Sequence, residues 1–479
     1  MLAWAAVKGA SWLVVSRIVG RSIDVLTLLI LARLLQPAEF GLVALAMALV
    51  VVVDTVLEIP TTQALIRLGT VDRSHLDTAF TLGVLRSIAV TAFLLAAMFP
   101  YSWIRGDTSL VPAIAVLAFG PALKGFASPA TIHFIRDVNF RPTFLIEMAS
   151  KLCAFVATVT IVNSGGSYWA IVASYVTNAL AATLASHFLA PYRPRLSLER
   201  LSDFASFIGW YSFAQLISAF NWQYDRFLVG AFGSHAMLGR YAVANDVAVI
   251  PTQSIIGPAL QPVMAAFSKI NTDHARMKFA LLRATRFAML ISVPACLGIS
   301  LTADLVTDIV LGPQWKDASI YLRLLAISVI PAPYFQVLYA ALLSIGRPKE
   351  IFRNNLLDLA IRVLFVSSAF FFFSALGACV ARIFISFAMF GLYVAQARRV
   401  FAVGITIQLK NLWKIIVSAG AMAVAVILLR AELDGLQIHA FLRLAAVAFV
   451  GAVAYCVSLF ALGVRIDIGP GKLDLVDRH

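Results

Sequence analysis

Long apolar runs recur along the whole chain and are separated by short polar connections. A helix needs about 20 apolar residues to cross the hydrocarbon core of a bilayer. Windows of about that length predict about 14 transmembrane helices, at residues 11–35, 41–60, 76–99, 109–128, 142–163, 167–189, 204–231, 237–263, 284–306, 319–343, 352–373, 375–396, 411–430 and 438–462. Since no connection is long enough for a soluble domain, the pattern predicts an all-α polytopic membrane protein.

The basic residues of the connections are concentrated on one side of the predicted membrane. With the N-terminus placed inside, 23 of the 38 Lys and Arg residues fall in inner connections and 5 in outer ones. Cytoplasmic connections carry such an excess, so both termini are expected in the cytoplasm. No small-residue cleavage site follows the first apolar segment, and we expect that segment to be retained rather than removed as a signal peptide.

The composition agrees with this class and excludes others. The chain is 61% hydrophobic and 13% charged, whereas soluble domains carry about 25% charged residues. The inner connections account for most of the net charge of +14, so nucleic acid is not an expected partner. The cysteines lie far apart in apolar segments, which argues against disulfides and metal sites. Because the sequence has no HExxH, P-loop or GxSxG motif and no long outer loop, a catalytic site is not expected.

An internal match indicates two related halves. Glu147 precedes Lys151 by four residues in one span, and Asp358 precedes Arg362 by four residues in a span 211 positions further on. Equivalent helices of the same orientation predict parallel repeats, with a site at their interface. The predicted domains are therefore a six-helix bundle over 1–200, a second six-helix bundle over 201–400, and two additional transmembrane helices with a cytoplasmic tail over 401–479.

The first span carries charges on one face. Arg17, Arg21 and Asp24 follow one another at intervals of four and three residues, which places them on the same side of a helix. A charge at the centre of the bilayer costs roughly 3 kcal/mol where it meets lipid. This face is therefore expected to look onto water or protein.

Basic residues recur deep inside other predicted spans as well. The six deep ones are Arg17, Arg21, Arg86, Lys151, Arg362 and Arg382. If all of them faced hydrocarbon, the total would be on the order of 15 to 20 kcal/mol, more than the net stability of a typical protein. They must line a hydrated or paired interior. Three bases near helix ends, Lys124, Arg323 and Arg443, are expected to extend to the membrane interface instead.

Neutralisation within one helix is the plainer alternative. The candidate pairs are Arg21 with Asp24, Glu147 with Lys151, and Asp358 with Arg362. This alternative does not account for Arg17, Arg86 and Arg382, which have no acid four residues away on their own helix. A surplus of buried cations favours an anionic substrate, and the planar fork of arginine suits phosphate oxygens.

Acids also lie inside the predicted spans. They either relay protons or bind a coupling cation, or they balance the charge of the cavity. The residues concerned are Asp24, Asp54, Glu147, Asp225, Asp246 and Asp358. No cofactor is expected, and coupling to a H⁺ or Na⁺ gradient is one of the two alternatives for these acids.

Several segments follow one another in a characteristic order: Ile30–Ala46, Thr62–Arg67, His75–Phe80, Gly166–Ala173, Asp225–Gly230 leading to Gly239–Tyr241, and Gly312–Trp315. This ordered set resembles the bacterial polysaccharide transporters, the oligosaccharide flippases of the MOP superfamily. No single segment is decisive, but together they cover nearly the whole chain in the expected order. The resemblance implies two six-helix bundles that face each other in a V, followed by two trailing helices.

The resemblance also implies a function. Such a flippase moves undecaprenyl-pyrophosphate-linked oligosaccharide across the bacterial cytoplasmic membrane by alternating access, for exopolysaccharide, capsule or lipopolysaccharide synthesis. We expect a monomer that works alongside a polysaccharide polymerase and glycosyltransferases. With Arg226 added to the six deep cations, the expected headgroup-binding residues are Arg17, Arg21, Arg86, Lys151, Arg226, Arg362 and Arg382.

Three other functions make different demands on the sequence. A drug or organic-ion antiporter of the same superfamily is expected to carry mid-membrane acids in excess over bases, the reverse of the pattern here. A membrane-embedded glycosyltransferase, polymerase or ligase needs a larger external loop than this chain has. A passive scramblase is compatible with the sequence.

Overall fold

The computed structural model describes residues 2–68, 70–137, 139–270, 272–433, 439–469 and 472–477. The chain divides into two compact units, residues 1–242 and 243–479. Each unit is described by itself below.

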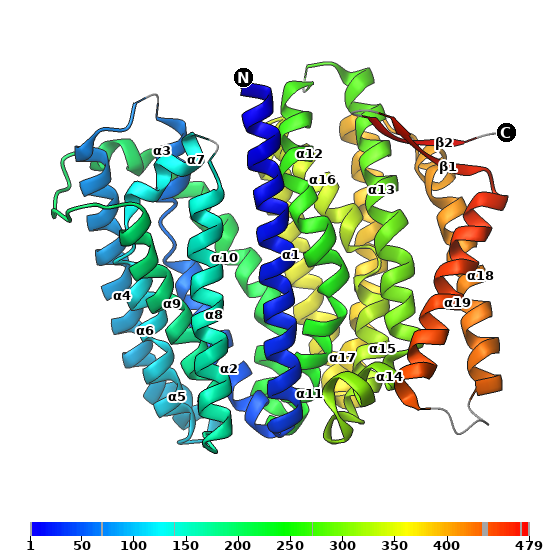
Figure 1. Cartoon of the computed structure of the whole chain (residues 1–479), viewed down its shortest axis with the longest axis horizontal. Coiled ribbons are helices and arrows are strands. Elements are labelled where there is room, and N and C mark those ends of the chain that lie inside the picture. The colour runs from blue at the N-terminus through cyan, green and yellow to red at the C-terminus, as the bar shows by residue number, and fades with distance from the viewer. Residues whose placement is uncertain are drawn as a thin grey trace. The chain divides into compact units, whose positions relative to one another are not determined.

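Unit 1 is a bundle of long helices with short helices at one end. Its elements are α1 (Leu2–Leu34), α2 (Pro37–Val56), α3 (Thr61–Arg67), α4 (Arg73–Arg105), α5 (Leu110–Leu117), α6 (Phe119–Lys124), the 3₁₀ turn η1 (Pro129–Thr131), α7 (Ile132–Arg136), α8 (Arg141–Asn163), α9 (Trp169–Leu189), α10 (Leu201–Phe232) and the first part of α11 (His235–Ala248). The short helices α3 and α7 lie at the end of the unit where α1 begins (Figure 1).

Unit 2 continues from α11. Its elements are the π-helical turn η2 (Thr252–Ile256), α12 (Gly257–Lys269), α13 (His274–Leu301), α14 (Ala303–Val306), the π-helical turn η3 (Thr307–Leu311), the 3₁₀ turn η4 (Pro313–Trp315), α15 (Ala318–Val329), α16 (Ala332–Ser344), α17 (Pro348–Phe401), α18 (Ile405–Leu433), α19 (Ala440–Ala461), β1 (Val464–Gly469) and β2 (Lys472–Asp477). Non-helical backbone at Phe373 and Ser374 divides α17 into two helices, where the sequence predicts the boundary between two spans.

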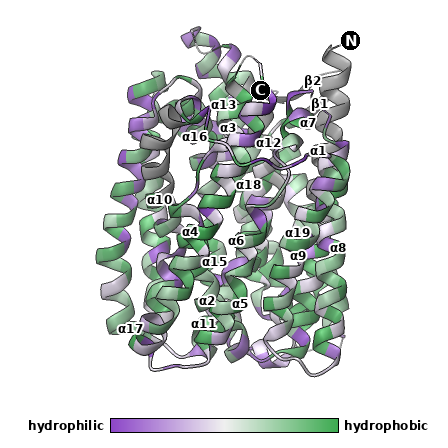
Figure 2. Cartoon of the chain, turned by 90° about the vertical axis from the view of Figure 1, so that its left-hand side faces the viewer, coloured by the Kyte–Doolittle hydropathy of each residue, from purple (hydrophilic) through white to green (hydrophobic). Residues whose placement is uncertain are grey.

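The prediction of an all-α polytopic membrane fold is confirmed. Among the described residues, 9 helices are long and apolar enough to cross a membrane, or 10 if the bent pair Leu110–Lys124 and Pro129–Arg136 forms one span. Hydrophobic residues cover most of the length of the helices (Figure 2). The count of 14 spans stays a prediction. The strands β1 and β2 form an antiparallel hairpin within the predicted C-terminal tail, which the hydropathy pattern did not indicate.

The two trailing helices belong to the packed core of unit 2. On α18, the amide of Gln408 accepts a hydrogen bond from the buried Tyr334 hydroxyl of α16. On α19, the hydroxyl of Tyr455 donates to the carbonyl oxygen of Leu290 on α13 at 2.8 Å. Buried polar contacts of this kind hold neighbouring helices together in a bilayer, where apolar side chains gain little by leaving lipid.

In unit 1, α2 and α11 touch backbone to backbone at two glycines. A Cβ added at Gly41 would overlap the backbone oxygen of His235, and one added at Gly239 would overlap the backbone oxygen of Pro37. Small residues permit such close helix approach inside membranes. The contact joins a helix of the first predicted half to a helix of the second.

This close approach predicts an unequal response to one methyl group. We expect Gly41→Ala to lower the free energy of unfolding by about 1 to 3 kcal/mol, the range for overpacking a filled site. Gly298→Ala on α13 is the control, since a Cβ there meets nothing within 4 Å. The measurement is thermal unfolding of each purified variant in detergent, and equal effects of the two changes would contradict the close approach.

Candidate functional site

The first group of predicted site residues lies between α1 and α8 and is organised around Asp24. The Nζ atom of Lys151 lies 2.5 Å from Asp24 Oδ1, and Nη1 of Arg21 lies 3.8 Å from Asp24 Oδ2. Glu147, also on α8, accepts a hydrogen bond from the hydroxyl of Ser16. One carboxylate of α1 therefore serves a cation of its own helix and a cation of α8.

The absence of a side chain at residue 20 lets these two helices approach. A Cβ added at Gly20 would lie 3.1 Å from Glu147 Oε1 and 3.1 Å from Lys151 Cε. Lys151 thus reaches across to Asp24 and not back along α8, so the predicted pairing of Glu147 with Lys151 within one helix is wrong. Lys151 contacts a carboxylate on another helix rather than the carboxylate four residues earlier on its own helix.

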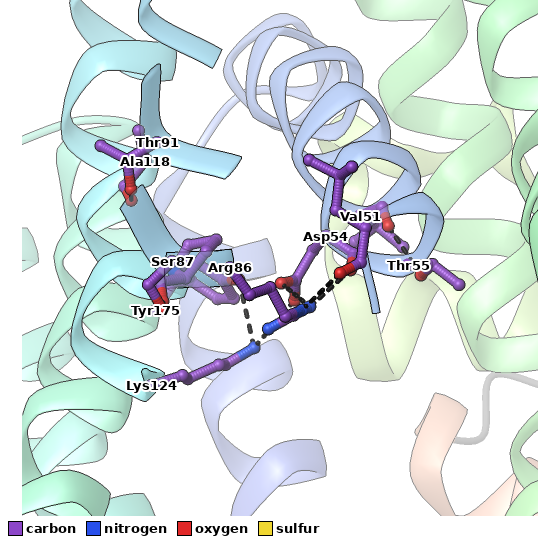
Figure 3. A network of polar contacts seen from close by, with 11 residues as sticks. Val51, Asp54, Thr55, Arg86, Ser87, Thr91, Ala118, Lys124 and Tyr175 are labelled. Carbon is purple, nitrogen blue, oxygen red and sulfur yellow. Dashed lines mark hydrogen bonds and ion pairs between the residues drawn. The ribbon is translucent and has the colours of Figure 1, made fainter. Parts of the chain in front are cut away.

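The second group joins α2, α4, α6 and α9. Arg86 Nη2 lies 2.6 Å from Asp54 Oδ1, and Lys124 Nζ lies 3.4 Å from Asp54 Oδ2 and 3.5 Å from the hydroxyl of Tyr175. Figure 3 shows the side chains of Arg86 and Lys124 both directed toward Asp54. Two cations share one carboxylate here, which leaves the group with a net positive charge.

Arg86 is held by the end of α2 as well as by the carboxylate. Its Nε donates to the carbonyl oxygen of Leu57 at 2.9 Å, and its Nη2 donates to the carbonyl oxygen of Asp54 at 2.5 Å. The last carbonyls of a helix lack intrahelical partners and carry partial negative charge. Arg86 therefore satisfies the C-terminal end of α2, a partner that no spacing within α4 predicts.

Lys124 is a site residue that sequence reasoning missed. The sequence predicts only that it extends to the membrane interface. In the structure its ammonium contacts Asp54 and the Tyr175 hydroxyl and lies 5.4 Å from the centroid of the Tyr175 ring. The pair of Lys124 with Asp54 spans 70 positions of sequence, so local periodicity carries no signal for it.

Two further predicted cations lie in unit 2. Arg362 Nε donates to Asp358 Oδ2 at 3.0 Å, which confirms the predicted pairing within one helix. Arg382 Nη1 donates to the side-chain oxygen of Asn245 at 2.9 Å. Both arginines are half-buried on α17.

The remaining predicted residues lie on α1, α10 and α11. Asp225 is buried on α10 and accepts a hydrogen bond from the Tyr241 hydroxyl at 3.1 Å. Arg226 and Asp246 are half-buried on α10 and α11. The backbone of Arg17 lies in α1, and its side chain falls outside the described part of the structure. No group of three metal-binding side chains is present among the described residues.

A third polar group lies at the end of unit 1 opposite α3 and α7. His235 Nε2 lies 2.8 Å from Asp107 Oδ2, while Arg105 donates to the carbonyl oxygens of Ala231 and Gly233. Burial disfavours the charged Asp107 carboxylate, but hydrogen bonds from Ser109 and the charges of His235 and Arg105 outweigh it and lower the pKa of Asp107. The connection after α4 is thereby attached to the connection between α10 and α11.

The fold defines the class of this protein. The chain is similar to the solved structure of the lipid II flippase MurJ in an inward closed conformation, with a TM-score of 0.74 and 11% identity over 93% of this chain and 97% of that chain. It is also similar to an inward-facing multidrug resistance MATE family transporter of the MOP superfamily, with a TM-score of 0.65 and 15% identity over 81% of this chain and 98% of that chain. The protein therefore has the MOP transporter fold.

Sequence comparison assigns the chain to a family within this fold. Residues 30–320 match the family described as "Polysaccharide biosynthesis protein", and the chain belongs to that family. It is 21% identical over 350 residues to the lipopolysaccharide biosynthesis protein WzxC of Escherichia coli (strain K12), covering 71% of this chain and 68% of that protein. It is 23% identical over 325 residues to the succinoglycan biosynthesis transport protein ExoT of Rhizobium meliloti (strain 1021), covering 67% and 65%.

These relationships confirm the resemblance that the sequence indicated. The chain spans about two thirds of the length of WzxC and of ExoT. It is a multi-pass membrane protein of a polysaccharide biosynthesis family.

The pairing of Lys151 with Asp24 can be measured by a double-mutant cycle. We expect Lys151→Gln and Asp24→Asn to be coupled by at least about 0.5 kcal/mol in the free energy of unfolding, as contacting residues are. The comparison cycle combines Lys151→Gln with Glu147→Gln, for which we expect the smaller coupling, because the structure pairs Lys151 with Asp24. Chemical or thermal unfolding in detergent provides both values, and the reverse order of the two couplings would favour the pair within α8.

Proposed function

We propose that this protein is a flippase that moves undecaprenyl-pyrophosphate-linked oligosaccharide across the bacterial cytoplasmic membrane by alternating access. The observation that carries the proposal is the sharing of the single Asp54 carboxylate by two cations, Arg86 and Lys124. In the first group, Arg21 and Lys151 lie beside two carboxylates, Asp24 and Glu147. Cations that are only partly neutralised in a low-dielectric interior attract an anionic headgroup.

The chemistry of the proposed cargo fits these side chains. A pyrophosphate offers several oxygens to guanidinium forks and ammonium groups, and such charge-assisted hydrogen bonds are about twice as strong as neutral ones. The lipid tail stays in the bilayer while the headgroup crosses. In this proposal the headgroup is bound by Arg17, Arg21, Arg86, Lys151, Arg226, Arg362 and Arg382, carried by two six-helix bundles over 1–200 and 201–400 with two additional helices over 401–479.

The proposal extends to coupling and to partners. The protein uses no cofactor, and a H⁺ or Na⁺ gradient drives transport through the acids that neighbour the cations. Both termini face the cytoplasm, as the distribution of Lys and Arg over the connections indicates. The protein works as a monomer beside the polymerase and the glycosyltransferases that use and supply its cargo.

A multidrug antiporter is the second candidate, because the chain shares the fold of a MATE family transporter. Fold likeness does not transfer a substrate. Organic cations require an excess of acids along their path, whereas Arg86 and Lys124 against the single Asp54 carboxylate leave a cation in excess. The charge of the site therefore favours the anionic cargo.

Arg21 provides the test of this proposal. We expect Arg21→Ala to abolish polymer export, because the headgroup loses a guanidinium near the middle of the first span, while membrane insertion and protein level stay unchanged. The measurement is polymer output of a deletion strain that carries the variant, together with lipid-linked oligosaccharide retained on the inner leaflet.

The control is Arg141→Ala, which removes an exposed arginine at the start of α8. Export by this variant should equal that of the unmodified protein. Undiminished export by Arg21→Ala at normal protein level would count against the proposed function, and resistance to organic cations in place of export would favour the antiporter.

A further inference from the structure

In the second group of site residues (Asp54, Arg86, Lys124 and Tyr175), the Asp54 carboxylate lies in the position that an anionic ligand would take. It is within 2.6 Å of Arg86 Nη2 and 3.4 Å of Lys124 Nζ (Figure 3). We propose that Arg86, Lys124 and Tyr175 form a subsite for a phosphate group, and that Asp54 occupies this subsite until the phosphate displaces it from Lys124. This inference rests on the proposed function, which it deepens by assigning Lys124 and Tyr175 to the headgroup.

Arg86 provides a donor that stays in place when the ligand changes. Its Nε and Nη2 are bound to the carbonyl oxygens of Leu57 and Asp54. These backbone bonds do not depend on the Asp54 carboxylate, so the guanidinium keeps its position when the carboxylate moves. Within the described part of the chain, Arg86 Nη1 has no hydrogen-bond partner, which leaves its two N–H groups free for a ligand.

Lys124 provides a donor that can change partners. Its side chain is 47% exposed, whereas those of Arg86 and Asp54 are only 16% and 19% exposed. Its contacts with Asp54 and with the Tyr175 hydroxyl, at 3.4 and 3.5 Å, are longer than the 2.6 Å contact of Arg86 with Asp54. The long, weakly held contact on the exposed side is the one that a competing anion breaks first.

A phosphate gains more from this subsite than the carboxylate does. It has more oxygens and more negative charge than a carboxylate, so it can accept from Arg86 Nη1, Lys124 Nζ and the Tyr175 hydroxyl together. Asp54 then keeps its bond to Arg86 Nη2. The same geometry would also follow from simple charge balance, and the two explanations differ in what happens when the Asp54 charge is removed.

Arg86 lies well within the length of α4 and not at its end. Arg86 is 13 residues after the start of α4 at Arg73, a distance of about 20 Å along a helix. Since α4 is long and apolar enough to cross a membrane, a headgroup that crosses in the proposed function passes the level of Arg86.

The experiment is calorimetric titration of the purified full chain in detergent with inorganic pyrophosphate, and in nanodiscs with undecaprenyl pyrophosphate. We expect Lys124→Gln to weaken binding at least about tenfold, equivalent to about 1.4 kcal/mol, and Lys124→Arg to retain most of it. Asp54→Asn should tighten binding, because the competing carboxylate is gone. Arg323→Gln in unit 2 is the control, since its side chain is also 47% exposed.

The outcomes separate this inference from the proposed function. Unchanged binding by Lys124→Gln, or weaker binding by Asp54→Asn at unchanged thermal stability, would overturn the subsite even if the unmodified protein exports polymer. Weakening of both titrations by Lys124→Gln supports a site for phosphate itself, and weakening of the lipid titration alone supports a site that also requires the tail. If the unmodified protein fails to restore export in the deletion strain, the proposed flippase function is wrong. The titrations would still test the phosphate subsite.

Discussion

The high energy of an unpaired charge inside a bilayer is the constraint on which this structure depends. Each charged group in lipid costs a few kcal/mol, and the chain places several in its spans. The described helices meet where those charges find partners: α1 meets α8 at Asp24, and α2 meets α4 and α6 at Asp54. Ion pairs between helices therefore help to determine which helices are neighbours. They also set the charge of the protein interior.

Glycines and short polar contacts make those pairings possible. Gly20 lets the side chains of Glu147 and Lys151 lie against α1, and Gly41 and Gly239 bring α2 and α11 into backbone contact. In the other unit, Tyr455 attaches the last helix to α13 by a hydrogen bond to a carbonyl oxygen. Inside a membrane, where burial of apolar surface gives little, close packing and hydrogen bonding carry helix association.

The fold identifies the structural class of the protein, whereas the charged side chains bear on its cargo. The same architecture occurs in a lipid II flippase and in multidrug transporters, so the fold alone does not select the cargo. In the proposed function, the feature that selects the cargo is the sign of the net charge at the paired groups. Arg86 and Lys124 against the single carboxylate of Asp54 leave a cation in excess, which suits a phosphorylated headgroup and membership of a polysaccharide biosynthesis family.

Hydropathy alone predicted the helical membrane fold, and residue spacing alone predicted the pair of Asp358 with Arg362, because both signals are local in sequence. The break in α17 at Phe373 and Ser374 also coincides with the boundary between two predicted spans. The partners of Lys151 and Lys124 lie 127 and 70 positions away. No periodicity records which helices pack together, and a long lysine side chain takes whichever carboxylate that packing brings within reach.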